Sequence, residues 1–206
     1  MSSPVSESDR QVVAAQLGRS PRAMHGIAHR CPCGNPDVVT TAPRLPDGTP
    51  FPTLYYLSCP VAAGRIGTLE ASGLMAEMTG RLAEDPELAA AYRTAHQRYL
   101  AERAELAEQA GIGAVPEIAG ISAGGMPDRV KCLHVLVAHS LAAGPGVNPL
   151  GDEALDRLGD WWTAGPCVPG PGGAEGDSER ASQERQRRGA PVSGAEHDVR
   201  ATGDQA

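Results

Sequence analysis

Large aromatic side chains, long apolar runs and clusters of basic residues are all scarce in this chain. Its 206 residues include one Phe, two Trp and four Tyr, so the core must be built mainly from Leu, Val, Ile, Met and Ala. No stretch reaches the roughly 18 apolar residues that a membrane-spanning helix needs. A net charge of −7 without a basic block argues against nucleic acid as a partner. We therefore expect a protein that binds neither membranes nor nucleic acids.

The first residues also lack the apolar centre of a secretory signal peptide, because Glu7, Asp9 and Arg10 interrupt them. We therefore predict a cytoplasmic protein. In that reducing compartment, five cysteines favour free thiols, metal ligands or redox chemistry over structural disulfides. Paired C-x-x-C motifs and the spacing of a P-loop are both missing, so no motif of fixed spacing identifies the chemistry.

A change of composition divides the chain near residue 164, beyond which Gly, Pro, Ser, Glu and Arg dominate. Such a segment cannot bury enough apolar surface to offset the entropy lost on ordering. We predict that residues 1–163 form a single α+β domain and that residues 164–206 form a disordered tail.

The domain is predicted to be a β-hairpin, or a small antiparallel sheet, packed against four or five helices. The hairpin signal is Leu45-Pro46-Asp47-Gly48 between two β-like runs, 38–44 and 49–58. Pro presets φ at the first central position and Gly accepts positive φ, which favours a type I turn with a bulge that pairs Leu45 with Thr49. The expected helices lie between Ser6 and Gly18 and over residues 64–82, 86–110, 127–143 and 152–162.

The hairpin is expected to bring cysteines together. Cys31 and Cys33 precede it, and in the predicted register Cys59 lies opposite Asn35, so these three sulfurs should fall within about 10 Å of one another. Cys132, in the first turns of the helix over 127–143, completes the best set of four ligands. Four thiolates suit tetrahedral Zn²⁺ or an iron–sulfur cluster.

Histidines offer alternative ligands, and His134 or His29 could replace one cysteine. His139 is seven residues from Cys132, a rise of about 10.5 Å on a helix, which is too far for one ion. On a regular helix His134 projects about 200° away from Cys132, so the two are not expected to converge. Inert buried thiols and a thiol–disulfide role for Cys31 and Cys33 stay open as alternatives. Cys167, in the predicted tail, is treated as incidental.

A second candidate site is an anion site at the start of the same helix. Gly124 and Gly125 let backbone amides approach a ligand, and a helix N-terminus favours negative charge. Arg129 and Lys131 add positive charge nearby, and Arg44 flanks the hairpin. A small anionic ligand such as a phosphate or a carboxylate is the partner this arrangement predicts; a solvated Gly-rich turn is the alternative.

Three stretches resemble a known family: Arg30-Cys-Pro-Cys-Gly with residues 43–60, Leu82-Ala-Glu-Asp-Pro-Glu-Leu, and residues 122–134 running to Asn148-Pro-Leu-Gly-Asp152. Together they resemble the bacterial, mainly actinobacterial, domain of unknown function 501 family, over about residues 8–160. The resemblance implies a cytosolic bacterial protein, and it supplies no activity, substrate or ligand.

The resulting hypothesis is a cysteine-rich Zn or iron–sulfur site next to an anion-binding helix N-terminus, in a small enzyme or sensor. The alternative is a non-catalytic interaction module with inert buried cysteines. That module would work through the helix over 86–110 and through Trp161 and Trp162, because tryptophans often anchor partners. Whether the protein is an enzyme stays open at this point.

Overall fold

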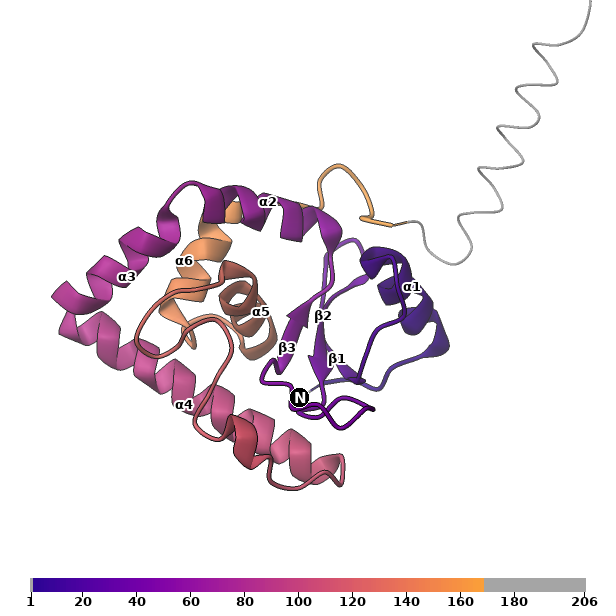
Figure 1. Ribbon diagram of the computed structural model, residues 1–206. Helices are drawn as coiled ribbons and strands as arrows, with labels where there is room; N and C mark the ends of the chain where they lie inside the picture. The colour runs from indigo at the N-terminus through magenta and orange to yellow at the C-terminus, as the bar shows by residue number, and fades with distance from the viewer. Residues whose placement is uncertain (1, 169–206) are drawn as a thin grey trace, which may run out of the picture. The chain divides into compact units, whose positions relative to one another are not determined.

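The computed structural model describes residues 2–168 (Figure 1). Within them the chain forms a three-stranded antiparallel sheet, six α-helices and one short 3₁₀-helix, which confirms the predicted α+β class. The elements are α1 (Glu7–Leu17), β1 (Met24–Arg30), β2 (Pro36–Thr41), β3 (Tyr55–Leu57), α2 (Pro60–Ala71), α3 (Leu74–Glu84), α4 (Pro86–Gln109), η1 (Pro116–Ile118), α5 (Leu133–Ala143) and α6 (Pro149–Leu158).

The central strand β2 organises the sheet, whose order is β1-β2-β3. All six residues of β2 are buried. Val39 packs into a small cluster with Val13 of α1, whereas Val38 packs into the larger core formed by the other helices. Successive strand residues face opposite sides of a sheet, so α1 covers one face and the remaining helices cover the other (Figure 1).

The helices on that second face surround α5 (Figure 1). Its sequence is apolar on all sides, as expected of a buried helix, and Leu136 and Val137 are fully buried. The long helix α4 contributes Tyr92 and Tyr99, which are also fully buried. The scarce aromatic residues therefore fill the largest spaces between α4, α5 and the sheet.

The predicted start of α1 is confirmed. Ser6 accepts a hydrogen bond from the Asp9 backbone amide at 3.1 Å, and the Asp9 carboxylate reaches back to the Ser6 amide at 3.2 Å. These two bonds form a capping box. Gly18 ends the helix in the left-handed region, where glycine is favoured.

The strand β1 lies outside every element that the sequence predicts. Residues Met24–Arg30 pair antiparallel with β2 at a register that shifts three times. Gly26 allows the backbone of β1 to lie close to the Ser2 and Thr40 side chains, because a Cβ at this position would collide with both. The long-range partner β2, rather than local β-propensity, makes this segment a strand.

The predicted turn forms, but the strand pairing beyond it is shifted by one residue. The Leu45 amide donates to the Thr49 carbonyl at 2.9 Å, as predicted. Further along, Val38 pairs with Leu57 instead of Tyr56. The extra residue lies at 52–53, where Arg103 of α4 donates to the Pro52 carbonyl at 3.0 Å. The shift places Cys59 beside Pro36 rather than Asn35.

Three helix boundaries also differ from prediction. The helix expected over 64–82 is two helices, α2 and α3, separated at Gly73 with φ +89°. The helix expected from residue 127 begins at Leu133, and α6 begins at Pro149, where Asn148 caps it through the Gly151 amide at 3.0 Å. The split at Gly73 explains why the structure has six helices instead of five.

The predicted tail falls largely on residues 169–206, which lie outside the described residues. Residues 164–168 are described, and Cys167 lies against Gln16 of α1. Among the residues described, no helix is both long and apolar enough to cross a membrane.

Close packing of α6 on α5 predicts an asymmetry between two helical glycines. A Cβ at Gly151 would collide with the Leu136 carbonyl and the Ser140 hydroxyl, whereas one at Gly67 of α2 would meet nothing within 4 Å. Gly151→Ala should lower the free energy of unfolding by about 1–3 kcal/mol. Gly67→Ala should leave it unchanged or raise it by about 0.5–1 kcal/mol. Urea denaturation measures both, and equal effects of the two substitutions would contradict this packing.

The buried His139 predicts a pH dependence of stability. Burial lowers the pKa of His139 from 6.5 to about 4, although Glu102 opposes the shift. Between these two pH values the unfolded chain binds a proton that the folded chain does not. The free energy of unfolding should therefore fall by up to about 3 kcal/mol as the pH drops from 6.5 to 4. His139→Gln keeps an acceptor for the Asn148 amide; this variant should be less stable at neutral pH, and its free energy of unfolding should change less between pH 6.5 and 4. If the variant keeps the pH dependence of the wild type, His139 is not its cause.

Candidate functional site

Three potential metal ligands meet between α2 and the start of α5. Glu70 lies in α2, Cys132 is the N-cap residue of α5, and His134 lies in its first turn. The His134 Nδ1 atom lies 3.1 Å from Glu70 Oε1 and 3.9 Å from Cys132 Sγ. All three ligand atoms lie within 4.8 Å of one another, and all three side chains are partly buried. These ligand types at this spacing could hold a metal ion, and the trio is called the Cys-His-Glu cluster below.

The orientation of the His134 ring is fixed from α2. Its Nε2 atom lies 3.2 Å from the Ala63 carbonyl, which can only accept a hydrogen bond, so Nε2 carries a proton. In the neutral ring Nδ1 then presents a lone pair to the Glu70 carboxylate and the Cys132 sulfur. Two acceptors facing each other at 3.1 Å need a cation between them, either a proton or a metal ion.

With a proton in that position, the neighbouring Cys132 and Glu70 side chains raise the pKa of His134 to about 9, against the opposing effect of burial. The site therefore favours positive charge at Nδ1. Glu70 Oε1 also accepts a hydrogen bond of 2.7 Å from the Leu133 amide, so the carboxylate caps the N-terminus of α5.

The meeting of Cys132 and His134 contradicts the sequence-based expectation that they diverge. That expectation assumed both residues on one regular helix, whereas Cys132 precedes α5 in an extended conformation with φ −157°. The helix starts late because the residues before it have other partners: the Val130 amide donates to Thr79 Oγ1 at 3.0 Å and the Lys131 amide to the Gly124 carbonyl at 2.7 Å.

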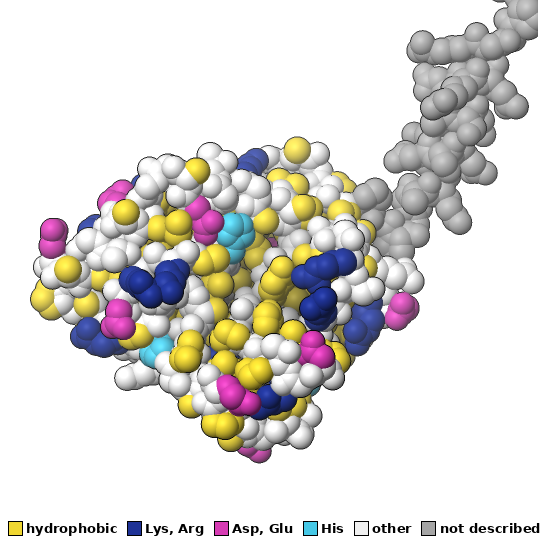
Figure 2. Space-filling model, viewed as in Figure 1, with side chains coloured by type: hydrophobic (Ala, Val, Ile, Leu, Met, Phe, Trp, Pro, Cys, Tyr) yellow, Lys and Arg dark blue, Asp and Glu magenta, His cyan; other side chains and the backbone are white. Residues whose placement is uncertain are grey.

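A hollow of about 570 Å³ opens beside the cluster, and Cys132 and His134 form part of its wall. A second hollow of about 320 Å³ lies on the other side of Leu17 and Tyr56, which line both. On this face the space-filling view shows a largely hydrophobic depression with basic side chains on either flank (Figure 2). The Cys-His-Glu cluster therefore borders a surface depression with room for a small molecule.

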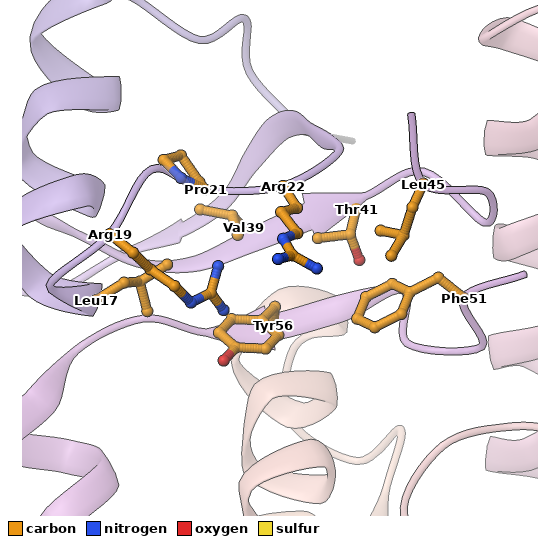
Figure 3. Close-up of a pocket in the computed structure, with 9 residues that line it drawn as sticks. All are labelled: Leu17, Arg19, Pro21, Arg22, Val39, Thr41, Leu45, Phe51 and Tyr56. Atoms are coloured by element: carbon orange, nitrogen blue, oxygen red, sulfur yellow. The ribbon is translucent and has the colours of Figure 1, made fainter. Parts of the chain in front are cut away.

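The second hollow combines two arginines with two aromatic rings. Arg19 and Arg22, from the connection between α1 and β1, extend over the space that Phe51 and Tyr56 line (Figure 3). The backbone next to Arg22 is unusual, since Ala23 has φ +51°, which costs free energy in a residue other than glycine. Guanidinium groups bind carboxylates and phosphates, while rings bind flat apolar groups. This hollow suits an anion with an aromatic or otherwise flat body.

The four predicted cysteine ligands separate into two groups. Cys31 and Cys33 lie in the turn that leads into β2, Cys59 follows β3, which pairs with β2, and both Cys31 and Cys59 are buried. Cys132 instead contacts His134 and belongs to the Cys-His-Glu cluster. His29, the other histidine considered, pairs with buried Asp37 at 2.8 Å.

The residues of the predicted anion site are placed apart as well. Arg44 forms a bidentate pair with Glu117 at 2.9 and 3.0 Å. Gly124 and Gly125 turn their carbonyls toward the amides of Lys131 and Arg129, whose side chains are exposed. The N-terminus of α5, which was expected to receive the anion, is capped by Glu70.

The tryptophans proposed as interaction anchors are not free surface groups. Trp161 is only 4% exposed, and Trp162, partly buried, packs edge-on against it at 4.7 Å between ring centroids. Sequence reasoning also missed Glu70, Arg19 and Arg22 as site residues. Glu70 stands in a helix of ordinary composition, and the two arginines flank a Pro-containing loop, so neither position carries a local signal.

Comparison with known proteins identifies a family and nothing more specific. A family model described as a protein of unknown function (DUF501) matches residues 27–156. This range contains every residue of the Cys-His-Glu cluster, whereas Arg19, Arg22 and Cys167 lie outside it. Neither the curated proteins nor the solved structures include a match.

Proposed function

This chain belongs to the DUF501 family, whose function is unknown, and we propose its function from the geometry of its own site. The protein binds a divalent metal ion at Glu70, Cys132 and His134, and this ion takes part in a reaction of a small organic anion. The observation that carries this proposal is the convergence of three ligand atoms: His134 Nδ1 lies 3.1 Å from Glu70 Oε1 and 3.9 Å from the Cys132 sulfur.

The set of donors favours zinc. One thiolate, one imidazole and one carboxylate are all common zinc ligands, with bond lengths of about 2.0–2.3 Å. Tetrahedral bonds of that length separate neighbouring ligand atoms by roughly 3.2–3.8 Å, close to the 3.1 and 3.9 Å seen here. The Ala63 carbonyl on Nε2 is the outer-shell partner that metal-bound histidines usually have.

Three protein ligands leave one position open, as in catalytic rather than structural zinc sites. In such sites the metal lowers the pKa of a bound water and polarises a carbonyl or phosphoryl oxygen. Cys132 and His134 also line the adjoining hollow, so a ligand bound at that position would be drawn from this hollow, and Tyr56 and Leu17 line both it and the hollow that contains Arg19 and Arg22. We infer hydrolysis or group transfer on an anion whose charged end lies at the arginines.

The metal proposal predicts the effects of substituting the ligands. Cys132→Ala and His134→Ala should each lower the zinc content of chelator-stripped, zinc-reconstituted protein by one equivalent per chain, measured by elemental analysis. Glu70→Gln, which keeps one oxygen donor but loses the charge, should weaken zinc binding without abolishing it. His25→Ala is the matched control, because His25 is exposed on β1 and lines neither hollow.

Two results would reject the metal. The first is equal zinc content in wild type and Cys132→Ala. The second is a folded, metal-free wild type in which Cys132 reacts with iodoacetamide at neutral pH much faster than the other cysteines. That second outcome would assign the cluster to a proton-bridged thiol nucleophile instead.

The anion proposal predicts the effect of removing one arginine. Phenyl phosphate, which combines an anion with a flat ring, should bind the wild type, and Arg22→Ala should weaken binding at least about tenfold, the value of one charge-assisted hydrogen bond. Phe51→Leu should weaken it less, since the apolar wall is partly kept. Isothermal titration calorimetry measures these affinities.

Arg10→Ala removes the same charge from the exposed side of α1, and Arg10 does not line the hollow. If Arg10→Ala and Arg22→Ala have the same effect, only the general charge of the protein attracts the ligand, and the pocket has no specific role.

A further inference from the structure

Four cysteines from three separate segments meet on the side of the sheet where β2 begins. Cys31 and Cys33 lie in the turn between β1 and β2, Cys59 is the N-cap residue of α2, and Cys167 follows α6. All four are free. Gln16 Nε2 donates to the Pro36 carbonyl at 2.6 Å and also lies 3.3 Å from Cys167 Sγ. The Ser58 amide donates to the Asp37 carbonyl, which places the next residue, Cys59, beside Pro36 as well. The four residues, called the four-cysteine cluster below, therefore gather around Pro36.

Hydrogen-bond donors surround these sulfurs. Gln16 Nε2 lies 3.3 Å from Cys167 Sγ, and Asn35 Nδ2 lies 3.8 Å from it. Backbone hydrogen bonds from Asn35 and Cys167 lower the pKa of Cys33, and those from Ala62 and Val61, in the first turn of α2, oppose the rise in the pKa of Cys59. Such donors stabilise negative charge on sulfur. A purely hydrophobic packing of thiols would not need them.

The backbone around Cys31 and Cys33 is folded into a tight loop. The Cys31 amide donates to the Asn35 carbonyl at 3.0 Å, and the Gly34 amide donates to the Cys31 carbonyl at 2.8 Å. Gly34 has φ +90°, which glycine adopts without strain. This loop places the sulfurs of Cys31 and Cys33, which are separated by one residue, on the same side of the chain.

Without a cation most of this group stays neutral. Burial raises the pKa of Cys31 to about 12 and that of Cys59 to about 11. The pKa of Cys33 is lowered by hydrogen bonds from Asn35, Cys31 and Cys167, although burial opposes the shift. A bound metal ion would deprotonate all four thiols outright.

From this arrangement we propose that Cys31, Cys33, Cys59 and Cys167 bind a second metal ion, zinc, in a closed tetrahedral site. Four thiol protons pass to solvent as four zinc–sulfur bonds form, and no atom changes oxidation state. No three of these sulfurs now lie within 4.8 Å of one another. Zinc binding must therefore bring neighbouring sulfurs to about 3.8 Å from each other, the distance between ligand atoms in a tetrahedral site.

This second site has a structural role. With four protein ligands it leaves no open position, and it ties the segment after α6 to the start of β2 and to α2. Gln16, which contacts Cys167 at 3.3 Å, also lines the hollow beside the Cys-His-Glu cluster. The four-cysteine site would therefore fix one wall of that hollow. Its existence does not depend on the function proposed above.

The test uses the full-length chain, purified anaerobically, stripped with a chelator and reconstituted with Zn²⁺ or Co²⁺. Four proteins are compared: wild type, Cys132→Ala, Cys167→Ser and the double variant. Cys132→Ala should keep one equivalent of zinc, and its Co²⁺ form should show the strong sulfur-to-metal charge-transfer absorption of four thiolates. Adding Cys167→Ser leaves three thiolates, so it should reduce that absorption and weaken zinc binding by more than the roughly tenfold to hundredfold cost of losing an outer-shell partner.

The four proteins separate the two proposals. If Cys132→Ala holds no zinc, the four-cysteine site is rejected, whatever happens at the Cys-His-Glu cluster. If Cys167→Ser leaves both the zinc content and the Co²⁺ spectrum of Cys132→Ala unchanged, Cys167 is not a ligand and the proposal also fails. Cys167 lies beyond the last helix, so the variant should stay folded, and circular dichroism checks this.

Discussion

The burial of β2 on both faces and both edges is the constraint on which the rest of the structure depends. Its six residues are all buried, β1 and β3 pair with its two edges, and Val38 and Val39 belong to different hydrophobic clusters. Each such side chain contributes about 1.5–3 kcal/mol by burial. Because the strand is fixed in every direction, the turn that precedes it and the end of β3 beside it are fixed as well. Cys31 and Cys33 lie in that turn, and Cys59 lies just after the end of β3.

Helix α2 connects the two proposed metal sites. It begins directly after Cys59, and Ala63 and Glu70, seven residues apart on one face, hold the His134 ring from two sides. The same helix thus orients a histidine through a carbonyl and a carboxylate and begins directly after a cysteine of the other proposed site. One helix therefore separates the two proposed sites, which agrees with different roles for them: a closed structural site at the start of α2 and an open site beside a hollow near its end.

Local signals in the sequence predict local structure well here. The capping box at Ser6, the turn at Pro46-Asp47-Gly48 and the Asp85 cap of α4 all follow from neighbouring residues, and all are present. Features that depend on distant partners were missed. The strand β1 needs β2, and the one-residue shift at 52–53 needs Arg103 of α4.

The same distinction explains what was predictable about the sites. The hairpin predicts that Cys31, Cys33 and Cys59 lie near one another, whereas the place of Cys167 in the proposed site depends on the path of the chain after α6. The meeting of Cys132 with His134 depends on where α5 begins, which Glu70 and Thr79 help to set from other helices. A single sequence contains no sign of such contacts.

The most direct test of the central claim is a crystal structure of zinc-reconstituted protein with anomalous diffraction recorded at both sides of the zinc absorption edge. The account predicts an anomalous peak within bonding distance of Cys132 Sγ, His134 Nδ1 and Glu70 Oε1, with a non-protein ligand in the remaining position. A map without a peak there, in which Nδ1 and Oε1 remain in direct hydrogen-bond contact at full zinc saturation, would contradict it.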